Sequence, residues 1–313
     1  MILEMVAEVS GLTQWGLMAF ANTASHRYKV YKIPKKKGGT RTVEQPSKEV
    51  KFLQRVLIEM LFSRLPVHSA ATAYVKGKGI AHNANQHVRS KYFVKFDFSD
   101  FFPSIKAHNI QSMLKRNLEA RGINLPASDL TLITNICCKK GQLVIGAPSS
   151  PILSNLIMYE FDKEFAERMA NRGVVYTRYA DDICLSSEYP NRLSDCDKEI
   201  MSVLSDFTDL KLKLNTAKTV HVSKKKKVII TGVTVTSDSS LSVGRVRKKF
   251  LRAKIHRALT GNLSPEHMKS LAGEIAYIDS IESGFYRSLI AKYGDELKNK
   301  LNSANWDAKW VKK

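Results

Sequence analysis

Three aspartates in this sequence stand where apolar, strand-like segments end. Asp97 follows YFVKF, and Asp181 and Asp182 form the centre of VVYTRYADDICLSS at residues 174–187. Carboxylates at the ends of buried strands repel one another and lose hydration, so they need a compensating positive charge. Two Mg²⁺ ions would provide it, one activating an attacking hydroxyl and the other holding a triphosphate and steadying the departing pyrophosphate. Oxygen donors suit Mg²⁺, which keeps its waters and uses few carboxylates.

An adjacent aspartate pair is weak support for this chemistry by itself, because Asp-Asp also caps helices and fills turns. Asp100 lies three residues after Asp97, beyond the expected end of the strand, and we expect it to orient the turn rather than to bind metal. The case therefore depends on the elements that would bring the three acids together.

The apolar periodicity predicts an α+β protein. Strands are expected at 27–34 and 40–46, joined by a turn in which Gly38 and Gly39 supply positive φ angles. A further strand is expected at 92–98, a hairpin with the acids at its tip at 174–187, and strands at 219–223 and 228–235. The same pattern predicts helices at 2–21, 47–65 (capped by Ser47), 107–121, 127–139, 150–170, 192–209 and 244–260.

Charge points to the kind of partner. The 313 residues include 50 Lys and Arg against 29 Asp and Glu, a formal net charge of +21 with a pI near 9.8. Such an excess favours nucleic acid as a partner. The rival partner, an anionic membrane, would need an amphipathic basic anchor or a long apolar span. We find no uninterrupted apolar run near 18 residues, and the N-terminus does not resemble a signal peptide. The cysteines (Cys137, Cys138, Cys184, Cys196) lack zinc spacing and are expected to be reduced core residues of a cytoplasmic protein.

The expected helix at 244–260 carries a basic face. Arg245, Lys248, Lys249, Arg252 and His256 recur at helical spacing, whereas Val246, Phe250 and Ala253 lie on a different face. A solvated basic face is a common alternative, but the net charge favours a contact with nucleic acid.

In this frame the sequence resembles the reverse transcriptases. Six segments occur in the family's order between about residues 27 and 236. IPKKKGGTRTVEQPS (33–47) resembles the fingers hairpin, Asp97 with its FxxFFPS tail resembles the A motif, and GAPSSPILSNL (146–156) resembles the B motif. YADD resembles the C motif, LKLNTAKT (212–219) resembles the D motif, and IITGVTV (229–235) resembles the segment after it. The resemblance implies a right-hand polymerase with fingers, a palm built on an antiparallel sheet, and a helical thumb. The expected divisions are an N-terminal helical segment at 1–26, fingers at 27–92, palm at 93–236 with part of the fingers at about 112–150, and thumb at 237–313.

Two signatures resemble the retron branch of the family. NANQH (83–87) is similar to its N-A-x-x-H signature, and Ile230-Thr231-Gly232 to its V-T-G signature with Ile for Val. The segments GRVRKKFLRAKIH and LAGEIAYIDSIESGFYRSLIAKYG look like a retron thumb.

The resemblance implies roles for single residues. Asp97, Asp181 and Asp182 would hold two Mg²⁺ ions near the Phe98 carbonyl, and Phe102 would be the steric gate that excludes a 2′-OH. Core packing is the alternative for Phe102. Basic side chains would bind the phosphates: Arg41 would clamp the triphosphate, and Lys35 would contact a phosphate, with Lys36 or Lys37 as substitutes. Lys218 would neutralise or protonate the leaving pyrophosphate. The alternative for Lys218 is a surface residue with no role in catalysis.

One stretch departs from the family. Leu143, Val144, Ile145 and Gly146 stand where the family usually reads L-P-Q-G, so Ile145 replaces a glutamine near the template base and the nucleotide sugar. We expect Ile145 and Gly146 to remain part of the nucleotide site. Fidelity, processivity or nucleotide selection could differ, while the metal site is untouched.

A retron enzyme, as the resemblance implies, binds its own structured noncoding RNA and extends DNA from the 2′-OH of an internal guanosine. The product is a branched RNA–DNA hybrid, multicopy single-stranded DNA (msDNA). Such enzymes use deoxynucleoside triphosphates and typically act in anti-phage defence with an accessory effector protein. Host RNase H is the expected partner for template removal, because the chain has no room for such a domain.

The residues expected to contact RNA lie in three segments: Asn83 and His87 in the first, Ile230, Thr231 and Gly232 in the second, and Arg245, Lys248, Lys249 and Arg252 in the third. Asn83 and His87 could instead be structural polar residues that hold a loop.

Two rival functions remain. One is another polymerase on the same palm, of the group II intron, diversity-generating or abortive-infection type; the absence of a maturase or endonuclease extension argues against the first. The other is a non-catalytic RNA-binding scaffold, against which the intact acids and Phe102 argue.

Overall fold

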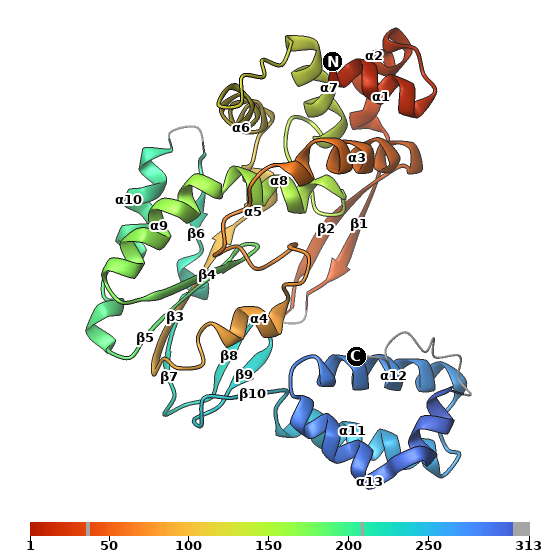
Figure 1. Ribbon diagram of the computed structural model, residues 1–313, viewed down its shortest axis with the longest axis vertical. Coiled ribbons are helices and arrows are strands. Elements are labelled where there is room, and N and C mark those ends of the chain that lie inside the picture. The colour runs from red at the N-terminus through yellow and green to blue at the C-terminus, as the bar shows by residue number, and fades with distance from the viewer. Residues whose placement is uncertain (36–37, 208–209, 303–313) are drawn as a thin grey trace. The chain divides into compact units, whose positions relative to one another are not determined.

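The computed structural model describes residues 1–35, 38–207 and 210–302, so Lys36 and Lys37 lie outside the described residues. The chain forms two compact units, one of residues 1–76 and 94–221, the other of residues 77–93 and the chain from 222 onward. Figure 1 labels their helices and strands. The expected boundaries of fingers, palm and thumb stay predictions, because the compactness of a unit does not define a polymerase subdomain.

A sheet in the first unit organises the segments that carry the aspartates. Its strands run in the order β4-β5-β3-β6, and β7 also pairs with β3. The hairpin expected at 174–187 is present: β4 and β5 are antiparallel with Tyr179 opposite Asp182, so Ala180 and Asp181 make the turn. The strands are β3 (Tyr92–Ser99), β4 (Val175–Tyr179), β5 (Asp182–Ser187), β6 (Lys213–Leu214) and β7 (Val220–Ser223).

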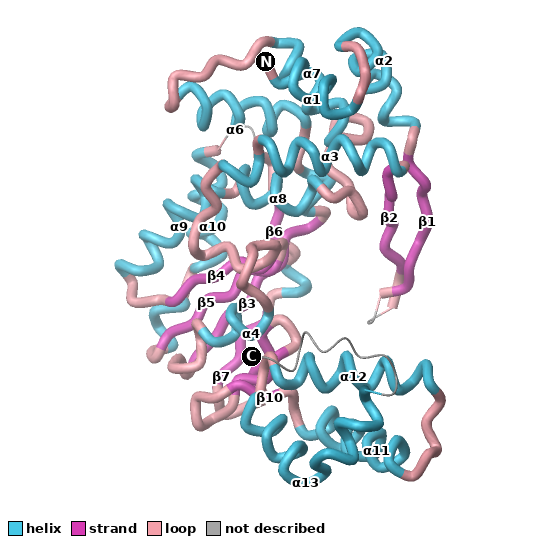
Figure 2. The backbone as a smooth tube through the Cα atoms, turned by 45° about the vertical axis from the view of Figure 1, so that its right-hand side comes forward, coloured by secondary structure: helices cyan, strands magenta, loops and turns pink. Residues whose placement is uncertain are grey.

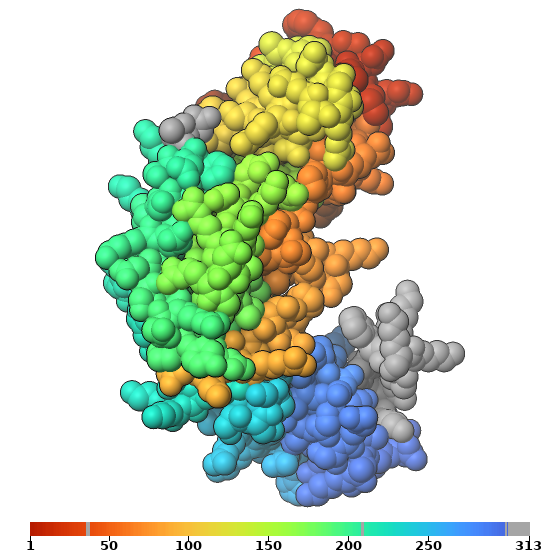
Figure 3. Space-filling model, turned by 60° about the vertical axis from the view of Figure 1, so that its left-hand side comes forward, coloured from red at the N-terminus to blue at the C-terminus, as the bar shows by residue number. Residues whose placement is uncertain are grey.

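Two helices replace the single helix expected at 150–170. The helix breaks at Met158, giving α8 (Ser149–Ile157) and α9 (Tyr159–Asn171). Aromatic packing fixes α9 against the sheet: the Phe165 ring stacks on Phe161 with centroids 5.4 Å apart and meets Tyr176 of β4 edge-on at 4.8 Å. α10 (Cys196–Asp206) begins later than expected and packs beside α9 through the ion pair of Arg168 with Glu199. Figure 3 shows the two segments as neighbouring green and blue-green parts of the surface.

The N-terminal segment also holds two helices where one was expected. Gly11, at φ 67°, ends α1 (Ile2–Ser10), and the Thr13 hydroxyl accepts from the Gly16 amide to begin α2 (Gln14–Thr23). The remaining helices of this unit are α3 (Lys48–Met60), α5 (Phe101–Ser104), α6 (Ala107–Glu119) and α7 (Ala127–Cys137), and α3 has the expected Ser47 cap. The short 3₁₀ helices are η1 (Ala24–His26), η2 (Phe62–Arg64), η3 (Pro190–Leu193) and η4 (Thr216–Lys218).

The expected basic hairpin forms a two-stranded ribbon that extends from the helices (Figure 2). β1 (Tyr28–Pro34) and β2 (Thr40–Pro46) are antiparallel, and Gly38 and Gly39 adopt φ 90° and 77° in the connection. A single backbone bond ties the ribbon to the B-motif loop: the Glu44 amide donates to the Ile145 carbonyl at 2.8 Å.

The second unit combines a small sheet with a helical bundle. The sheet has the order β10-β9-β8, and the strand expected at 228–235 is interrupted by a turn at Thr231 and Gly232. Three helices enclose an apolar core that includes Leu251, Ile275 and Leu289. The elements are α4 (Ile80–Asn85), β8 (Val228–Ile230), β9 (Val233–Val235), β10 (Leu241–Ser242), α11 (Arg245–Leu259), α12 (Pro265–Asp279) and α13 (Ser283–Asn302).

Helix α1 is held by a buried carboxylate from a distant part of the chain. Asp129 of α7 accepts from the amides of Ile2 and Leu3, both at 2.9 Å, where α1 has orphan donors. Replacing Asp129 by Ala should lower the free energy of unfolding by about 1–3 kcal/mol, because one buried and one partly buried amide lose their acceptor. Urea unfolding measures the change. Exposed Glu59 on α3 is the matched control, and Glu59→Ala should change stability by less than about 0.5 kcal/mol; equal effects of the two substitutions would contradict the capping role.

Candidate active site

The sheet brings the three aspartates to one place. Asp97 lies near the end of β3, and Asp181 and Asp182 lie at the β4–β5 turn on the neighbouring strand. The Phe98 amide donates to the Asp181 carbonyl at 3.1 Å, and the Asp97 carbonyl accepts from the Asn215 amide at 2.7 Å. The backbones that carry the acids are therefore fixed to one another by hydrogen bonds.

Lys218 completes this group. It lies at the end of η4, and its ammonium donates to Asp97 Oδ1 at 2.6 Å although its side chain is 58 % exposed. An exposed lysine that reaches a partly buried acid supplies local counter-charge. The contact places the D-motif lysine beside the acids, as the sequence indicated.

A cavity of about 590 Å³ lies in front of the acids. Its lining includes Asp97, Asp181 and Lys218 together with three more residues expected to bind nucleotide, Lys35, Arg41 and Phe102. Ile145 and the Phe98 backbone region also line it, whereas Asp182 and Gly146 are adjacent in the chain to lining residues. Acids, cations and an aromatic ring thus face one space of a size suited to a small ligand.

The acids carry more negative charge than their surroundings balance. Desolvation and the charge of Asp97 raise the pKa of Asp181. Desolvation, the charges of Asp181 and Asp97, and a hydrogen bond with Asp97 raise the pKa of Asp182 to about 7. Carboxylates with raised pKa values gain most from a nearby cation.

The negative charge of the three aspartates bears on whether a divalent ion fits this site. Within the described residues no set of three or more His, Cys, Asp or Glu side chains is already spaced as a metal site. The three acids nevertheless offer hard oxygen donors and an unbalanced charge, and Lys218 is the cation that Asp97 contacts in this structure. The donor chemistry therefore fits divalent ions.

Phe102 faces the cavity, whereas its neighbour packs in the core. Phe101 is buried and stacks on Phe98 with centroids 5.9 Å apart. Phe102 is half-buried and lines the cavity. Asp100 takes φ 45° at the start of α5 and also lines the cavity, so its expected role in orienting the turn stays a prediction.

Gly146 allows the basic hairpin to approach the B-motif loop. Its φ is 114°, and a Cβ there would lie 3.0 Å from both the Glu44 carbonyl oxygen and Val43 Cγ1. Glycine fits this position because any side chain would strain the backbone angle and crowd both contacts. Ile145 accepts the Glu44 amide through its backbone, a bond that does not depend on its side chain.

Several residues near the site were not identified from the sequence. Arg178 and Asp162 form a wholly buried ion pair behind the β4–β5 turn. Tyr74 lines the cavity with φ 61°, a left-handed conformation that is unusual for a bulky side chain. A charge within the apolar strand VVYTRY was a usable signal for Arg178, because a buried charge requires a partner.

The two retron signature segments contact each other within the second unit. Asn83 Nδ2 lies 3.4 Å from Thr231 Oγ1, which in turn lies 3.4 Å from the Ile80 carbonyl. Asn83, His87 and Ile230 are buried, and burial lowers the pKa of His87 to about 3, so its ring stays neutral. Burial supports the structural role considered for Asn83 and His87, whereas Gly232 is exposed.

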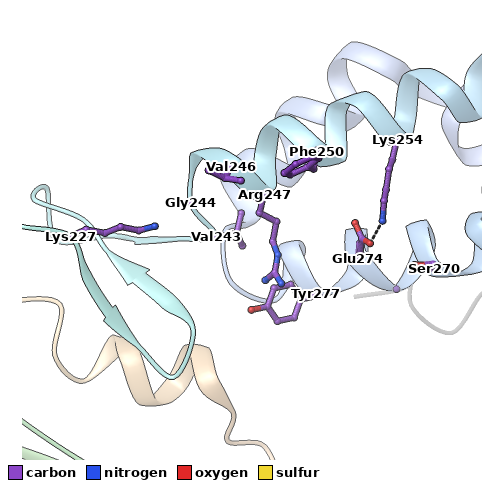
Figure 4. Close-up of a pocket in the computed structure, with 11 residues that line it drawn as sticks. Lys227, Val243, Gly244, Val246, Arg247, Phe250, Lys254, Ser270, Glu274 and Tyr277 are labelled. Atoms are coloured by element: carbon purple, nitrogen blue, oxygen red, sulfur yellow. Dashed lines mark hydrogen bonds and ion pairs between the residues drawn. The ribbon is translucent and has the colours of Figure 1, made fainter. Parts of the chain in front are cut away.

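The basic face expected on α11 is only partly free. Arg245, Lys249 and Arg252 are exposed, but Lys248 is half-buried and ion-paired with Glu282. A groove on another side of α11 contains exposed Val246 and Phe250, with Arg247 stacked on Tyr277 at 4.6 Å and Lys254 paired with Glu274 (Figure 4). No helix in the described chain is both long and apolar enough to span a bilayer.

The raised pKa of Asp182 gives a pH prediction. The folded protein keeps the Asp182 proton where the unfolded chain, with a pKa near 3.8, has lost it. Without divalent ions, the wild type should therefore lose stability relative to Asp182→Asn as the pH rises from about 4 to about 7. Chemical unfolding in a chelator across this range measures the difference. Parallel curves for the two proteins would contradict the raised pKa.

The sequence is similar to those of known proteins. Residues 33–235 match the family "Reverse transcriptase (RNA-dependent DNA polymerase)". The chain is 36% identical over 280 residues to the retron Ec83 reverse transcriptase of Escherichia coli, covering 87% of this chain and 88% of that protein. It is 34% identical to the retron Ec73 enzyme and 32% to the retron Ec86 enzyme of the same species, covering 86% and 90% of this chain and 88% and 86% of those proteins.

Solved structures show the fold. Apo telomerase from Candida tropicalis superposes with a TM-score of 0.53 at 10% identity, over 87% of this chain and 58% of that one. Telomerase from Candida albicans gives 0.51 at 13% identity, over 90% and 59%. This chain therefore spans about three fifths of those telomerase chains, and the expected right-hand polymerase fold is confirmed. Together with the family match, these findings show that the chain belongs to the reverse transcriptases, as an RNA-directed DNA polymerase of the retron type.

Proposed function

We propose that this reverse transcriptase copies DNA at the cavity in front of Asp97, Asp181 and Asp182. The supporting observation is that acids from two neighbouring strands share one space with Lys35, Arg41 and Lys218. Reverse transcriptases use divalent ions, and we propose that two Mg²⁺ ions are used here, held by Asp97, Asp181, Asp182 and the Phe98 carbonyl. When bound, the ions would supply activation of the primer hydroxyl and neutralisation of the triphosphate charge.

The chain's own residues would orient the substrate. Arg41 presents a planar donor fork suited to phosphate oxygens, and Lys35, which lines the same cavity, adds a second positive charge. Lys218, which lies within hydrogen-bonding distance of Asp97, would give a proton to the departing pyrophosphate. Phe102, Ile145 and Gly146 would bound the space for sugar and base.

The nucleic-acid partners belong to the same proposal. The enzyme would bind a structured retron RNA, prime from the 2′-OH of an internal guanosine and make branched msDNA in the bacterial cytoplasm, with host RNase H removing template. A role in anti-phage defence with an effector protein follows from the same class. The net charge of +21 supports distributed phosphate contacts, and exposed Arg245, Lys249, Arg252 and the Thr231–Gly232 turn are the candidate RNA-contacting residues.

The acids are tested by Asp181→Asn. DNA synthesis should fall more than about 1,000-fold, because several kcal/mol of transition-state stabilisation depend on the ions that this carboxylate would hold. Binding of the retron RNA should stay within about 3-fold of wild type, because phosphate contacts elsewhere supply that affinity. Primer extension and filter binding measure the two quantities. Asp197→Asn, on the first turn of α10, is the control, and unchanged synthesis by Asp181→Asn would contradict the site.

The role of Phe102 is tested by nucleotide selection. Phe102→Ala should lower the preference for deoxynucleotides over ribonucleotides by about 10–100-fold, because the ring would no longer exclude a 2′-OH. Single-nucleotide extension with each substrate measures the ratio. Phe52→Ala on α3, an exposed phenylalanine that does not line the cavity, is the control. An unchanged ratio in a folded Phe102→Ala protein would assign Phe102 to packing alone.

A further inference from the structure

A buried arginine lies directly behind the turn that carries two of the acids. Arg178 is in β4, three residues before Asp181, and has no exposed surface. Its Nε and Nη2 donate to the two oxygens of Asp162 on α9, at 2.8 and 2.6 Å, and Asp162 is equally buried. This two-point contact fixes the guanidinium in both position and plane.

The third nitrogen of Arg178 points toward the active-site turn. Nη1 donates to the Ala180 carbonyl at 3.1 Å and to Asn155 Oδ1 at 3.2 Å. Ala180 adopts φ 59°, a left-handed conformation that costs an alanine energy and that the surroundings must hold in place. The bond from Arg178 is thus a direct constraint on the residue that precedes Asp181.

The backbone of Arg178, independently of its side chain, and the Asn155 amide also bond to the segment before Tyr74. The Arg178 amide donates to the Ala70 carbonyl at 2.8 Å, and the Thr72 amide donates to the Arg178 carbonyl at 2.9 Å. Asn155 Nδ2 donates to the Ala73 carbonyl at 2.8 Å. These bonds fix the segment that ends at Tyr74, the cavity-lining residue at φ 61°.

Stability alone is a poor explanation for this arrangement. Removing two charges from water costs several kcal/mol, and apolar residues of similar volume often stabilise a core as well as a buried ion pair does. What an apolar replacement cannot supply is a donor directed at the Ala180 carbonyl. Tyr176, whose hydroxyl donates to Asp162 at 2.6 Å, adds a further fixed contact to the pair.

We propose that the Arg178–Asp162 pair is a positioning device for catalysis: it holds the Ala180 turn so that Asp181 and Asp182 meet Asp97 at the correct separation for divalent ions. Arg178 and Asp162 touch neither substrate nor ion and act through the backbone of the turn. The inference rests on the proposed function, because it assumes that the three acids hold the ions.

The test separates position from stability. In the triple variant Arg178→Met, Asp162→Leu and Tyr176→Phe, apolar groups replace the network and no charge is left unpaired. The folded variant should show a kcat about 10–100-fold below wild type and a similar loss of Mn²⁺ affinity, the usual effect of removing groups that orient metal ligands. KM for deoxynucleotides should change less than about 3-fold, since the cavity cations remain. Steady-state kinetics, Mn²⁺ electron paramagnetic resonance and thermal unfolding supply the readouts.

Arg168→Met is the matched control. Arg168 lies on the same helix as Asp162, but its ion pairs with Glu164 and Glu199 are at the surface, so kcat and Mn²⁺ affinity should stay at wild-type values. If the triple variant does not fold, Arg178→Lys keeps the charge and removes the two-point contact, and the same losses are expected. A folded triple variant or Arg178→Lys with wild-type kcat and Mn²⁺ affinity overturns the inference.

Asp181→Asn, assayed alongside, distinguishes the two possible failures. Loss of synthesis in Asp181→Asn with wild-type behaviour of the folded network variant rejects only the positioning role. Retention of synthesis and Mn²⁺ binding in Asp181→Asn rejects the metal assignment itself and the inference with it.

Discussion

Like charges held close together at the end of one sheet are the constraint on which this site depends. Asp97, Asp181 and Asp182 repel one another, and the pKa of Asp182 shows the effect by rising to about 7. The sheet holds the acids together against this repulsion, since the Phe98 amide donates to the Asp181 carbonyl and links the two segments. The Lys218 ammonium balances part of the negative charge through its ion pair with Asp97. A site with charge left to balance is well suited to polyvalent cations and to the phosphates they accompany.

The surroundings of the acids come from distant parts of the chain, each attached by a small number of specific contacts. Gly146 admits the basic hairpin to within van der Waals distance, and the Glu44–Ile145 backbone bond fixes it there. Because that bond uses the Ile145 carbonyl, the hairpin attachment is independent of the side chain in which this sequence departs from its family. The departure therefore bears on what Ile145 presents to the cavity.

Much of this arrangement could be predicted from the sequence, because it depends on residue patterns within short segments. The β4–β5 hairpin, the basic ribbon and the Ser47 cap each follow from alternation, glycine or a capping residue within a few positions. The breaks at Gly11 and Met158 were missed, since apolar periodicity continues across both. The ion pair of Arg178 with Asp162 could not be predicted from the sequence, because the two residues are 16 positions apart on different elements and only tertiary packing brings them together.

Predictions about the RNA contacts met a similar limit. The motif around Asn83 marks a retron enzyme, yet its side chain is buried and bonds to Thr231, so a signature of the class can reflect architecture as well as recognition. On α11, helical spacing located the basic residues correctly, but it could not show that Lys248 is paired with Glu282.

The central claim is that the three aspartates form a divalent-ion centre. The most direct test is a crystal structure with Mn²⁺, primer–template and an incoming deoxynucleotide, in which an anomalous difference map locates the manganese ions. We expect two manganese peaks at the end of the sheet, with carboxylate oxygens of Asp97 and Asp181 at coordination distance from the ions. A bound nucleotide with no anomalous peak beside these acids would contradict it.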